Sequence, residues 1–257
     1  MKRWNIFEFI DFPWFPSIFR DPMTDAMYAL HRIFRTYRVW TQRIADVLKK
    51  TGYRSIIDLG SGSGGPAIIL NEKLGSIHSL SISTTLTDLF PNKTSVESVN
   101  ASNNPRIRYF KRSVDATNVP KEFDGIRTMI GCFHHMNPSL ARRILENAFL
   151  SRKPICIFEI TENSLLALLF GVLLTPIIFV LTPFFLKSKP SIIFILVMPV
   201  VAIIGLWDML MSFPRTYSPE DLRELTNDLK SEDYLWDIGS SRRWLIRMPY
   251  LIGMPQK

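Results

Sequence analysis

The stretch from Ser55 to Pro66, with the sequence SIIDLGSGSGGP, constrains the fold of this chain more than any other feature. A short apolar run ends in an acid, Asp58, and a glycine-rich turn follows. Glycine adopts positive φ without steric cost and lets other groups approach the backbone closely. The apolar residues after Pro66 read as the start of a helix, whose free N–H groups point back at the turn. A strand, a glycine turn and a helix in this order predict a doubly wound α/β fold.

The acid before the first glycine separates two interpretations of this turn. Gly60, Gly62 and Gly65 satisfy the G-x-G-x-x-G spacing of a dinucleotide-binding loop, which leaves an NAD-dependent reductase as an alternative. The pattern D-x-G-x-G-x-G that starts at Asp58 instead resembles motif I of the class I S-adenosylmethionine (SAM)-dependent methyltransferases. The resemblance implies SAM as the cofactor, held at this turn by Asp58, Gly60, Ser61, Gly62 and Gly64.

Further residues at expected strand ends extend the resemblance. Asp88 follows the β-rich run 79–86, where the family places an acid that accepts hydrogen bonds from the ribose hydroxyls. A lone surface acid at a strand end is the alternative interpretation. Asp115 and Ala116, after an expected strand over 106–112, resemble the family's adenine-binding turn. Cys132, which follows the fourth expected strand, completes the cofactor-binding candidates.

The catalytic candidates are two adjacent histidines, His134 and His135. They follow Phe133 at the end of the fourth strand, and the Phe-His-His ending resembles motif IV of several small-molecule methyltransferases. A neutral histidine there could accept a proton from a substrate hydroxyl. The alternative is that either ring is structural and bonds a loop carbonyl. The resemblance also places Glu159, after the fifth strand, near the rim of the active site.

An apolar insertion interrupts the family pattern after the fifth strand. Neither 164–186 nor 191–207 contains a charged residue, and each is about long enough to cross a hydrocarbon layer of about 30 Å, the second only marginally. The short link Lys187-Ser188-Lys189-Pro190 predicts a helical hairpin. Three prolines and the two link lysines argue against full spanning, because lysines favour the cytoplasmic side and the SAM-binding part must also lie there. A re-entrant or interface-lying hairpin would resolve this conflict, and a buried hairpin in a soluble protein is the alternative.

The N-terminal residues 1–52 are expected to form an aromatic segment and a cover helix. Aromatic side chains crowd the range 4–19, where they either lie at a lipid headgroup layer or pack on the domain. The apolar spacing from Pro22 to Lys50 predicts one helix with Thr24 as its cap and Gly52 after its end. A helix just before motif I is usual in the family and often covers the SAM site.

The C-terminal residues resume the α/β pattern. Ser218 and Pro219 predict the start of a helix, and 234–239 and 244–248 read as two strands. The family closes its sheet with such an antiparallel pair. The whole is expected to be a seven-stranded, mostly parallel doubly wound sheet with an inserted apolar helical hairpin. Its parts are a SAM-binding half over 53–162, the hairpin over 163–213 and the rest of the α/β domain over 214–257.

Charge and cysteine content bound the partners. The net charge of +8 suits an anionic membrane surface or a nucleic acid, but no Lys/Arg-rich tail is present and no nucleic-acid partner is expected. Cys132 and Cys156 lack metal-ligand spacing, so no metal site is expected.

The motif resemblance implies a SAM-dependent methyltransferase, and the apolar insertion adds the expectation that it acts on an apolar or lipid-like small molecule at a membrane, with its catalytic domain facing the cytoplasm. A non-catalytic membrane-associated scaffold with the same fold is the alternative from another class.

Overall fold

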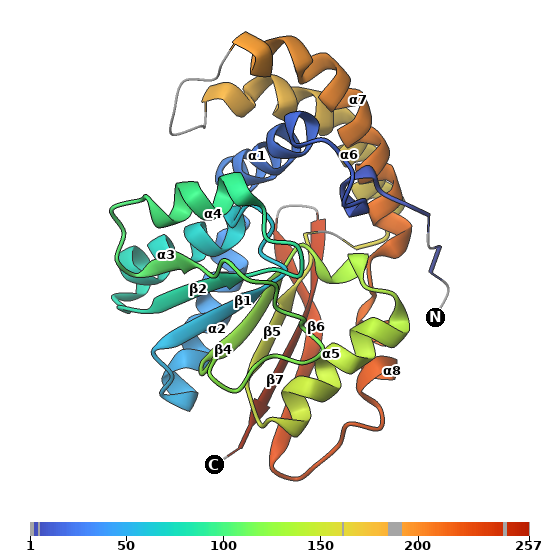
Figure 1. Ribbon diagram of the computed structural model, residues 1–257. Coiled ribbons are helices and arrows are strands. Elements are labelled where there is room, and N and C mark those ends of the chain that lie inside the picture. Colours follow the sequence, from blue (N-terminus) through green and yellow to red (C-terminus); the bar gives the residue numbers. More distant parts are fainter. Residues whose placement is uncertain (1–2, 5, 161, 185–191, 244–245, 257) are drawn as a thin grey trace.

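The computed structural model describes residues 3–4, 6–160, 162–184, 192–243 and 246–256. These residues contain a seven-stranded sheet in the order β3-β2-β1-β4-β5-β7-β6 (Figure 1). The first five strands pair in parallel, and β7 pairs antiparallel with both β5 and β6. The bounds are β1 (Ser55–Leu59), β2 (Ser83–Thr87), β3 (Ile107–Tyr109), β4 (Ile126–Ile130), β5 (Ile155–Phe158), β6 (Tyr234–Arg243) and β7 (Ile246–Pro255). The expected mostly parallel sheet and its antiparallel ending are confirmed.

Eight α-helices and three short 3-10 helices lie within the described residues. The α-helices are α1 (Ser17–Ile33), α2 (Tyr37–Thr51), α3 (Gly65–His78), α4 (Lys93–Asn100), α5 (Pro138–Leu150), α6 (Leu165–Leu181), α7 (Ile192–Arg215) and α8 (Pro219–Thr226). The 3-10 helices are η1 (Phe9–Asp11), η2 (Phe133–His135) and η3 (Thr182–Phe184). As expected from the sequence, Ser218 caps α8: its hydroxyl accepts a hydrogen bond from the Asp221 amide.

Alternating side chains along the strands place helices on both faces of the sheet. Ile57 and Leu59 on β1 pack into a buried cluster with residues of α5 and α8. Ile56, the residue before Ile57, packs on the other face with residues of α2 and α3, because successive side chains of a strand point to opposite faces. A strand that is apolar on both faces is typical of a parallel sheet covered on both sides.

The expectation of one helix over 22–50 is wrong. The chain forms α1 and α2, which are separated by a break in which Arg35 takes a left-handed conformation with φ of 51°. His31 stabilises the break, because its Nδ1 lies 2.8 Å from the Thr36 hydroxyl. Thr24 is no cap but lies inside α1, where its hydroxyl donates to the Asp21 carbonyl. Gly52 ends α2 with φ of 79°, as expected.

The apolar insertion forms the hairpin of α6 and α7, which lies beyond α1 at one end of the molecule (Figure 1). The two helices approach closely where glycines face large side chains: a Cβ on Gly205 would lie 2.4 Å from the Phe179 ring. Both Leu165–Phe184 and Ile192–Arg215 are long and apolar enough to cross a membrane. Of the most apolar stretch of 18 residues in each, only 28% and 22% are buried. The link 187–190, on which the hairpin prediction relied, lies outside the described residues.

The hairpin does not stand apart from the domain, because α1 joins the two. Phe15, just before α1, and Met23 and Ala26, within it, share a buried cluster with residues of α6 and α7. α1 also packs against α3, the helix that follows the glycine turn. The described part of the hairpin is therefore held beside the carboxyl ends of the parallel strands, where ligands bind in open α/β sheets.

Candidate active site

The glycine turn lies between β1 and α3 and has the backbone that its sequence predicts. Gly60, Gly62 and Gly64 have φ of 66°, 53° and 83°. At Gly64 the need for glycine is also steric, because a Cβ there would lie 2.2 Å from Leu86 Cδ2 on β2. Around Gly62 a Cβ would meet nothing within 4 Å, so this part of the turn borders open space. The turn therefore packs tightly on one side and leaves room for a ligand on the other.

The side chain of Asp58, at the end of β1, stabilises this turn through hydrogen bonds. Its side chain is buried, and its Oδ2 and Oδ1 accept hydrogen bonds from the hydroxyls of Ser61 and Thr128, each at 2.6 Å. The Ser61 amide in turn donates to the Thr87 carbonyl at 2.9 Å and joins the turn to β2. Burial raises the pKa of Asp58 to about 6. Both carboxylate oxygens are thus occupied by residues that set the shape of the turn.

Asp88, directly after β2, contacts the turn itself. Its Oδ2 accepts a hydrogen bond from the Gly62 amide at 2.8 Å, and its Oδ1 accepts one from the Phe90 amide at 2.9 Å. Burial raises the pKa of this carboxyl group, and these amide hydrogen bonds oppose the rise. Asp88 and Gly62, both predicted to bind the cofactor, are therefore brought together at the carboxyl edge of the sheet.

The remaining cofactor-binding candidates lie around the same edge. Asp115 is exposed, and its Oδ1 accepts hydrogen bonds from the amide and hydroxyl of Thr117. The preceding Val114 amide donates to the Asp88 carbonyl at 2.9 Å, which ties this loop to the end of β2. Ala116 is half-buried and packs against the core cluster under α5. Cys132 borders the turn, since its Sγ would lie 3.5 Å from a Cβ on Gly60.

A cavity of about 540 Å³ lies between the start of α1 and the segment after Asp88. It is lined by residues of 13–20 and by residues 89–93, Leu89 and Phe90 among them. A second cavity of about 360 Å³ is lined by residues of 55–57, 83–85, 105–108 and 122–124, at the opposite, amino end of the strands. None of the predicted cofactor-binding residues lines either cavity, but the first is lined by Leu89 and Phe90, which directly follow Asp88.

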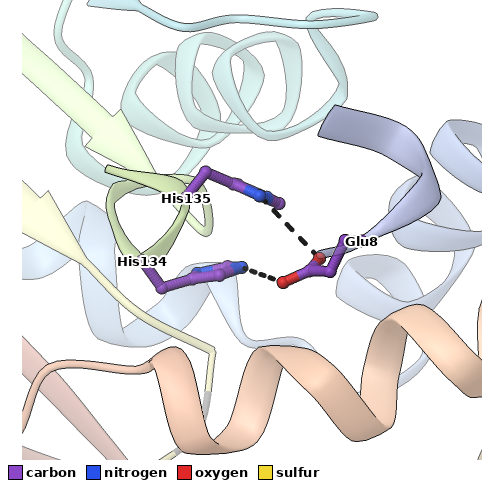
Figure 2. A group of neighbouring side chains, drawn as sticks. All are labelled: Glu8, His134 and His135. Carbon is purple, nitrogen blue, oxygen red and sulfur yellow. Dashed lines mark ion pairs between the residues drawn. The ribbon is translucent and has the colours of Figure 1, made fainter. Parts of the chain in front are cut away.

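His134 lies in η2, just after β4, and is held by a buried carboxylate. Its amide donates to Glu159 Oε1 at 2.9 Å, and its ring Nδ1 lies 2.8 Å from Glu159 Oε2. Because a carboxylate only accepts, the Nδ1 carries a proton, and in the neutral ring Nε2 keeps its lone pair. This nitrogen points toward Glu8, whose Oε1 lies 4.0 Å away (Figure 2). His134 therefore has the orientation of a proton acceptor.

His135 is half-buried and meets two acids of the N-terminal segment. Its Nδ1 lies 2.7 Å from Asp11 Oδ1. The same atom lies 3.8 Å from Glu8 Oε2 (Figure 2). Arg215 Nη1, from the end of α7, contacts the same acids at 2.6 Å from Asp11 Oδ2 and 3.1 Å from Glu8 Oε1. Burial raises the pKa of Glu8. Burial acts in the same direction on Asp11, but the hydrogen bonds to His135 and Arg215 hold its pKa well below the usual range.

Sequence reasoning missed most of this cluster. Glu8, Asp11 and Arg215 were not among the candidates, and Glu159 was expected near the rim but without a partner. The available signal was composition, because Glu8 and Asp11 are acids within an aromatic segment and Arg215 follows a long apolar run. Arg3 was missed too: it donates to the carbonyls of Arg215, His134 and Met136 and lies 3.6 Å above the Tyr217 ring.

Comparison with known proteins supports the fold. No protein-family model matches the chain, and no curated protein matches its sequence at a significant level. Among solved structures, the plantazolicin methyltransferase BpumL in complex with SAH is 13% identical, with a TM-score of 0.51 over 93% of this chain and 86% of its own. Its complex with a monoazolic desmethylPZN analog and SAH is 12% identical, with a TM-score of 0.51 over 93% and 98%. The methyltransferase domain of bacterial-CtHen1-CN is 13% identical, with a TM-score of 0.50 over 86% and 99%. The sheet order, its antiparallel ending and these likenesses agree that the chain has the fold of the class I SAM-dependent methyltransferases.

Proposed function

We propose that this protein is a SAM-dependent methyltransferase that acts on an apolar or lipid-like small molecule at a membrane surface. The observation that carries the proposal is the contact between Asp88 Oδ2 and the Gly62 amide. It places an acid with acceptor capacity for ribose hydroxyls beside a glycine turn that borders open space. The antiparallel β7 between β5 and β6 argues against the NAD-dependent reductase, because a dinucleotide-binding sheet is not expected to end in this way.

The cofactor-binding residues of the proposal are those that follow β1, β2, β3 and β4 at the carboxyl edge of the sheet. Gly60, Gly62 and Gly64 provide close backbone approach, and Asp58 with Ser61 holds their geometry. The other proposed contacts come from Asp88, Asp115, Ala116 and Cys132. When bound, SAM supplies an electrophilic sulfonium methyl group.

The protein's own contribution is to orient the acceptor, to exclude water and to take up a proton. His134 is the proposed base, with Nε2 as the accepting atom. Glu159 fixes its tautomer and stabilises the imidazolium that forms, since the carboxylate stays hydrogen-bonded to Nδ1–H. His135, beside it, is the second proposed catalytic residue, with its ring centroid 4.2 Å from that of His134.

The apolar hairpin supports a membrane location and an apolar acceptor. Large aliphatic side chains on both helices face outward, with Leu173 65% exposed on α6 and Leu196 70% exposed on α7. Trp14, which precedes α1, is 67% exposed near the same end of the molecule. Aromatic side chains of this kind favour the headgroup layer. Arg215, at the end of α7, contacts the His135 carbonyl in η2, so α7 links the apolar surface to the segment that carries His134.

Product formation tests the proposal directly. Purified protein is incubated with SAM carrying a labelled methyl group and with a lipid extract, and both SAH release and label in the lipid fraction are measured. Both signals are expected, and both should fall in Asp88→Ala. SAH or SAM binding without any transfer would favour a non-catalytic scaffold, and no binding of either would contradict the assignment.

A further inference from the structure

The two histidines of η2 and Glu8 form a cluster whose geometry suits a metal ion. One ligand atom from each of Glu8, His134 and His135 lies within 4.8 Å of the others (Figure 2). Ligands at about 2.1 Å from a zinc ion in tetrahedral geometry are about 3.4 Å apart. Glu8 Oε1 lies 4.0 Å from His134 Nε2 and Glu8 Oε2 lies 3.8 Å from His135 Nδ1, so these two separations exceed that value by about 0.6 and 0.4 Å. Small side-chain rotations would close the difference.

A buried carboxylate orients one of these rings in the way that metal-binding histidines are usually oriented. Glu159 Oε2 holds His134 Nδ1 at 2.8 Å, which leaves Nε2 as the free donor atom toward Glu8. Metal-binding histidines almost always donate their other ring N–H to such a group, and this contact fixes the ring and raises its basicity. The backbone amide of His134 donates to the same carboxylate at 2.9 Å, so the orientation is held at two points.

The charge balance of the cluster also favours a divalent cation. Four carboxylates lie in or beside it within the described residues, and two guanidiniums accompany them, which leaves a net charge of −2 when both imidazoles are neutral. The carboxylates are those of Glu8, Asp11, Glu159 and Asp208, and the guanidiniums are those of Arg3 and Arg215. Glu8, Glu159 and Asp208 are buried, and a buried net charge is costly unless it is paired.

We propose that Glu8, His134 and His135 bind one divalent transition-metal ion, with Zn²⁺ as the first candidate. Two imidazoles and one carboxylate suit zinc and its neighbours rather than Mg²⁺ or Ca²⁺, and three protein ligands leave a position open. When His135 binds the metal through Nδ1, this atom gives up its contact with Asp11. Asp11 keeps its 2.6 Å ion pair with Arg215.

The site has a consequence for catalysis that rests on the proposed function. An ion at this position, beside the end of β4, would lower the pKa of an acceptor hydroxyl bound at the open position, so that the hydroxyl would give up its proton to water. His134 would then act as a metal ligand. The metal, and not the lone pair of His134 Nε2, would activate the acceptor hydroxyl. The metal-binding claim itself does not depend on methyl transfer and is tested without it.

The test is calorimetric titration of Zn²⁺ into the full-length protein after dialysis against a chelator. One equivalent is expected to bind, and substitution of Co²⁺ should give the visible absorption of a low-symmetry site. Glu8→Gln and, as a second ligand variant, His135→Gln should lose this binding. Glu159→Gln should weaken it about 10- to 100-fold, because only the orienting contact is lost. His78→Gln is the matched control, since His78 lies at the far end of α3, and it should bind zinc as the unaltered protein does.

Titration of SAH into the same samples separates this inference from the proposed function. Two results would overturn the metal site alone. In one, the protein binds SAH but no zinc; in the other, the Glu8→Gln and His135→Gln variants both bind zinc normally. A protein that binds zinc through these residues but no SAH supports the site and contradicts the methyltransferase assignment. Retained SAH binding in Glu8→Gln would also establish that this variant is folded.

Discussion

Glu159 contacts His134 twice: one carboxylate oxygen accepts from its backbone amide at 2.9 Å, and the other lies 2.8 Å from its ring Nδ1. The carboxylate follows β5 and the histidine follows β4, so two neighbouring parallel strands set this geometry. Both side chains are buried, with Glu159 2% and His134 6% exposed. The pair therefore has a fixed tautomer and ring orientation before any ligand arrives.

Replacement of Glu159 by glutamine tests the role of this pair as a positioning contact. We expect turnover to fall by about 10²- to 10⁴-fold, the usual contribution of a positioned base, with little change in SAH affinity. The pH profile of turnover should also shift, because the carboxylate no longer stabilises the imidazolium. Glu122→Gln, at an exposed position, is the control and should keep full activity. A normal turnover and profile in Glu159→Gln would remove the pair from the mechanism.

Asp88→Ala should weaken SAH binding about 10- to 100-fold in calorimetry. The basis is the net loss of one charge-assisted hydrogen bond to the ribose, which contributes about 1.5–3 kcal/mol. Asp46→Ala, on the exposed face of α2, removes an acid of the same size far from the turn and should bind normally. Equal affinities in the two variants would exclude Asp88 from the site.

Gly64 in the glycine turn and Gly52 at the end of α2 have similar φ angles, so Gly52 provides a control for substitution of Gly64. Gly64 and Gly52 have φ of 83° and 79°, but only at Gly64 does a Cβ clash, 2.2 Å from Leu86 Cδ2. Both alanine variants should lose about 1 kcal/mol or more of unfolding free energy to backbone strain. Gly64→Ala should lose more, and it alone should lose SAH affinity. Urea denaturation and SAH titration measure the two effects, and equal losses in both variants would contradict the steric argument.

The buried carboxyl of Asp58 should make stability depend on pH. Its pKa is about 6 in the folded protein and about 3.9 in an unfolded chain, so the folded state binds the extra proton between these values. The unfolding free energy that Asp58 contributes is therefore greatest below pH 4 and falls as the pH rises to about 6. The total loss is about 3 kcal/mol, at about 1.4 kcal/mol per pKa unit.

The comparison that isolates this contribution is with Asp58→Asn, measured by urea denaturation at each pH. Asparagine keeps the size of the side chain and has no titration, so the difference between the two proteins should shrink or change sign across this window. A constant difference from pH 4 to pH 7 would show that Asp58 titrates normally.

Charges placed on the exposed face of the hairpin should release the protein from lipid. We expect Leu173→Lys combined with Leu196→Lys to abolish flotation with anionic liposomes, since a lysine near the centre of a membrane helix costs about 2.5–3.5 kcal/mol. Leu150→Lys is the control, because Leu150 is 71% exposed on α5 of the sheet domain and outside the hairpin. If the double variant floats as well as the control, the hairpin does not hold the protein on the membrane.

Local patterns in the sequence predicted the α/β sheet, the glycine turn and the helix cap at Ser218. Each depends on a backbone preference or a side-chain period within a few residues, such as positive φ at Gly60 and Gly62. The break between α1 and α2 could not be predicted in this way. It depends on Arg35 in a left-handed conformation that arginine does not favour by itself, held by a contact between His31 and Thr36.

The tertiary structure alone decided what surrounds the histidine pair. Glu8 reaches His134 from the N-terminal segment, Arg215 comes from the end of α7, and Glu159 directly follows the neighbouring strand β5. No periodicity links these residues, because their contacts follow from how α1 and α7 pack beside the sheet. The sequence by itself determined the fold and the turn, since those follow from local backbone and burial preferences. The charge environment of the site comes from long-range packing, which no short pattern encodes.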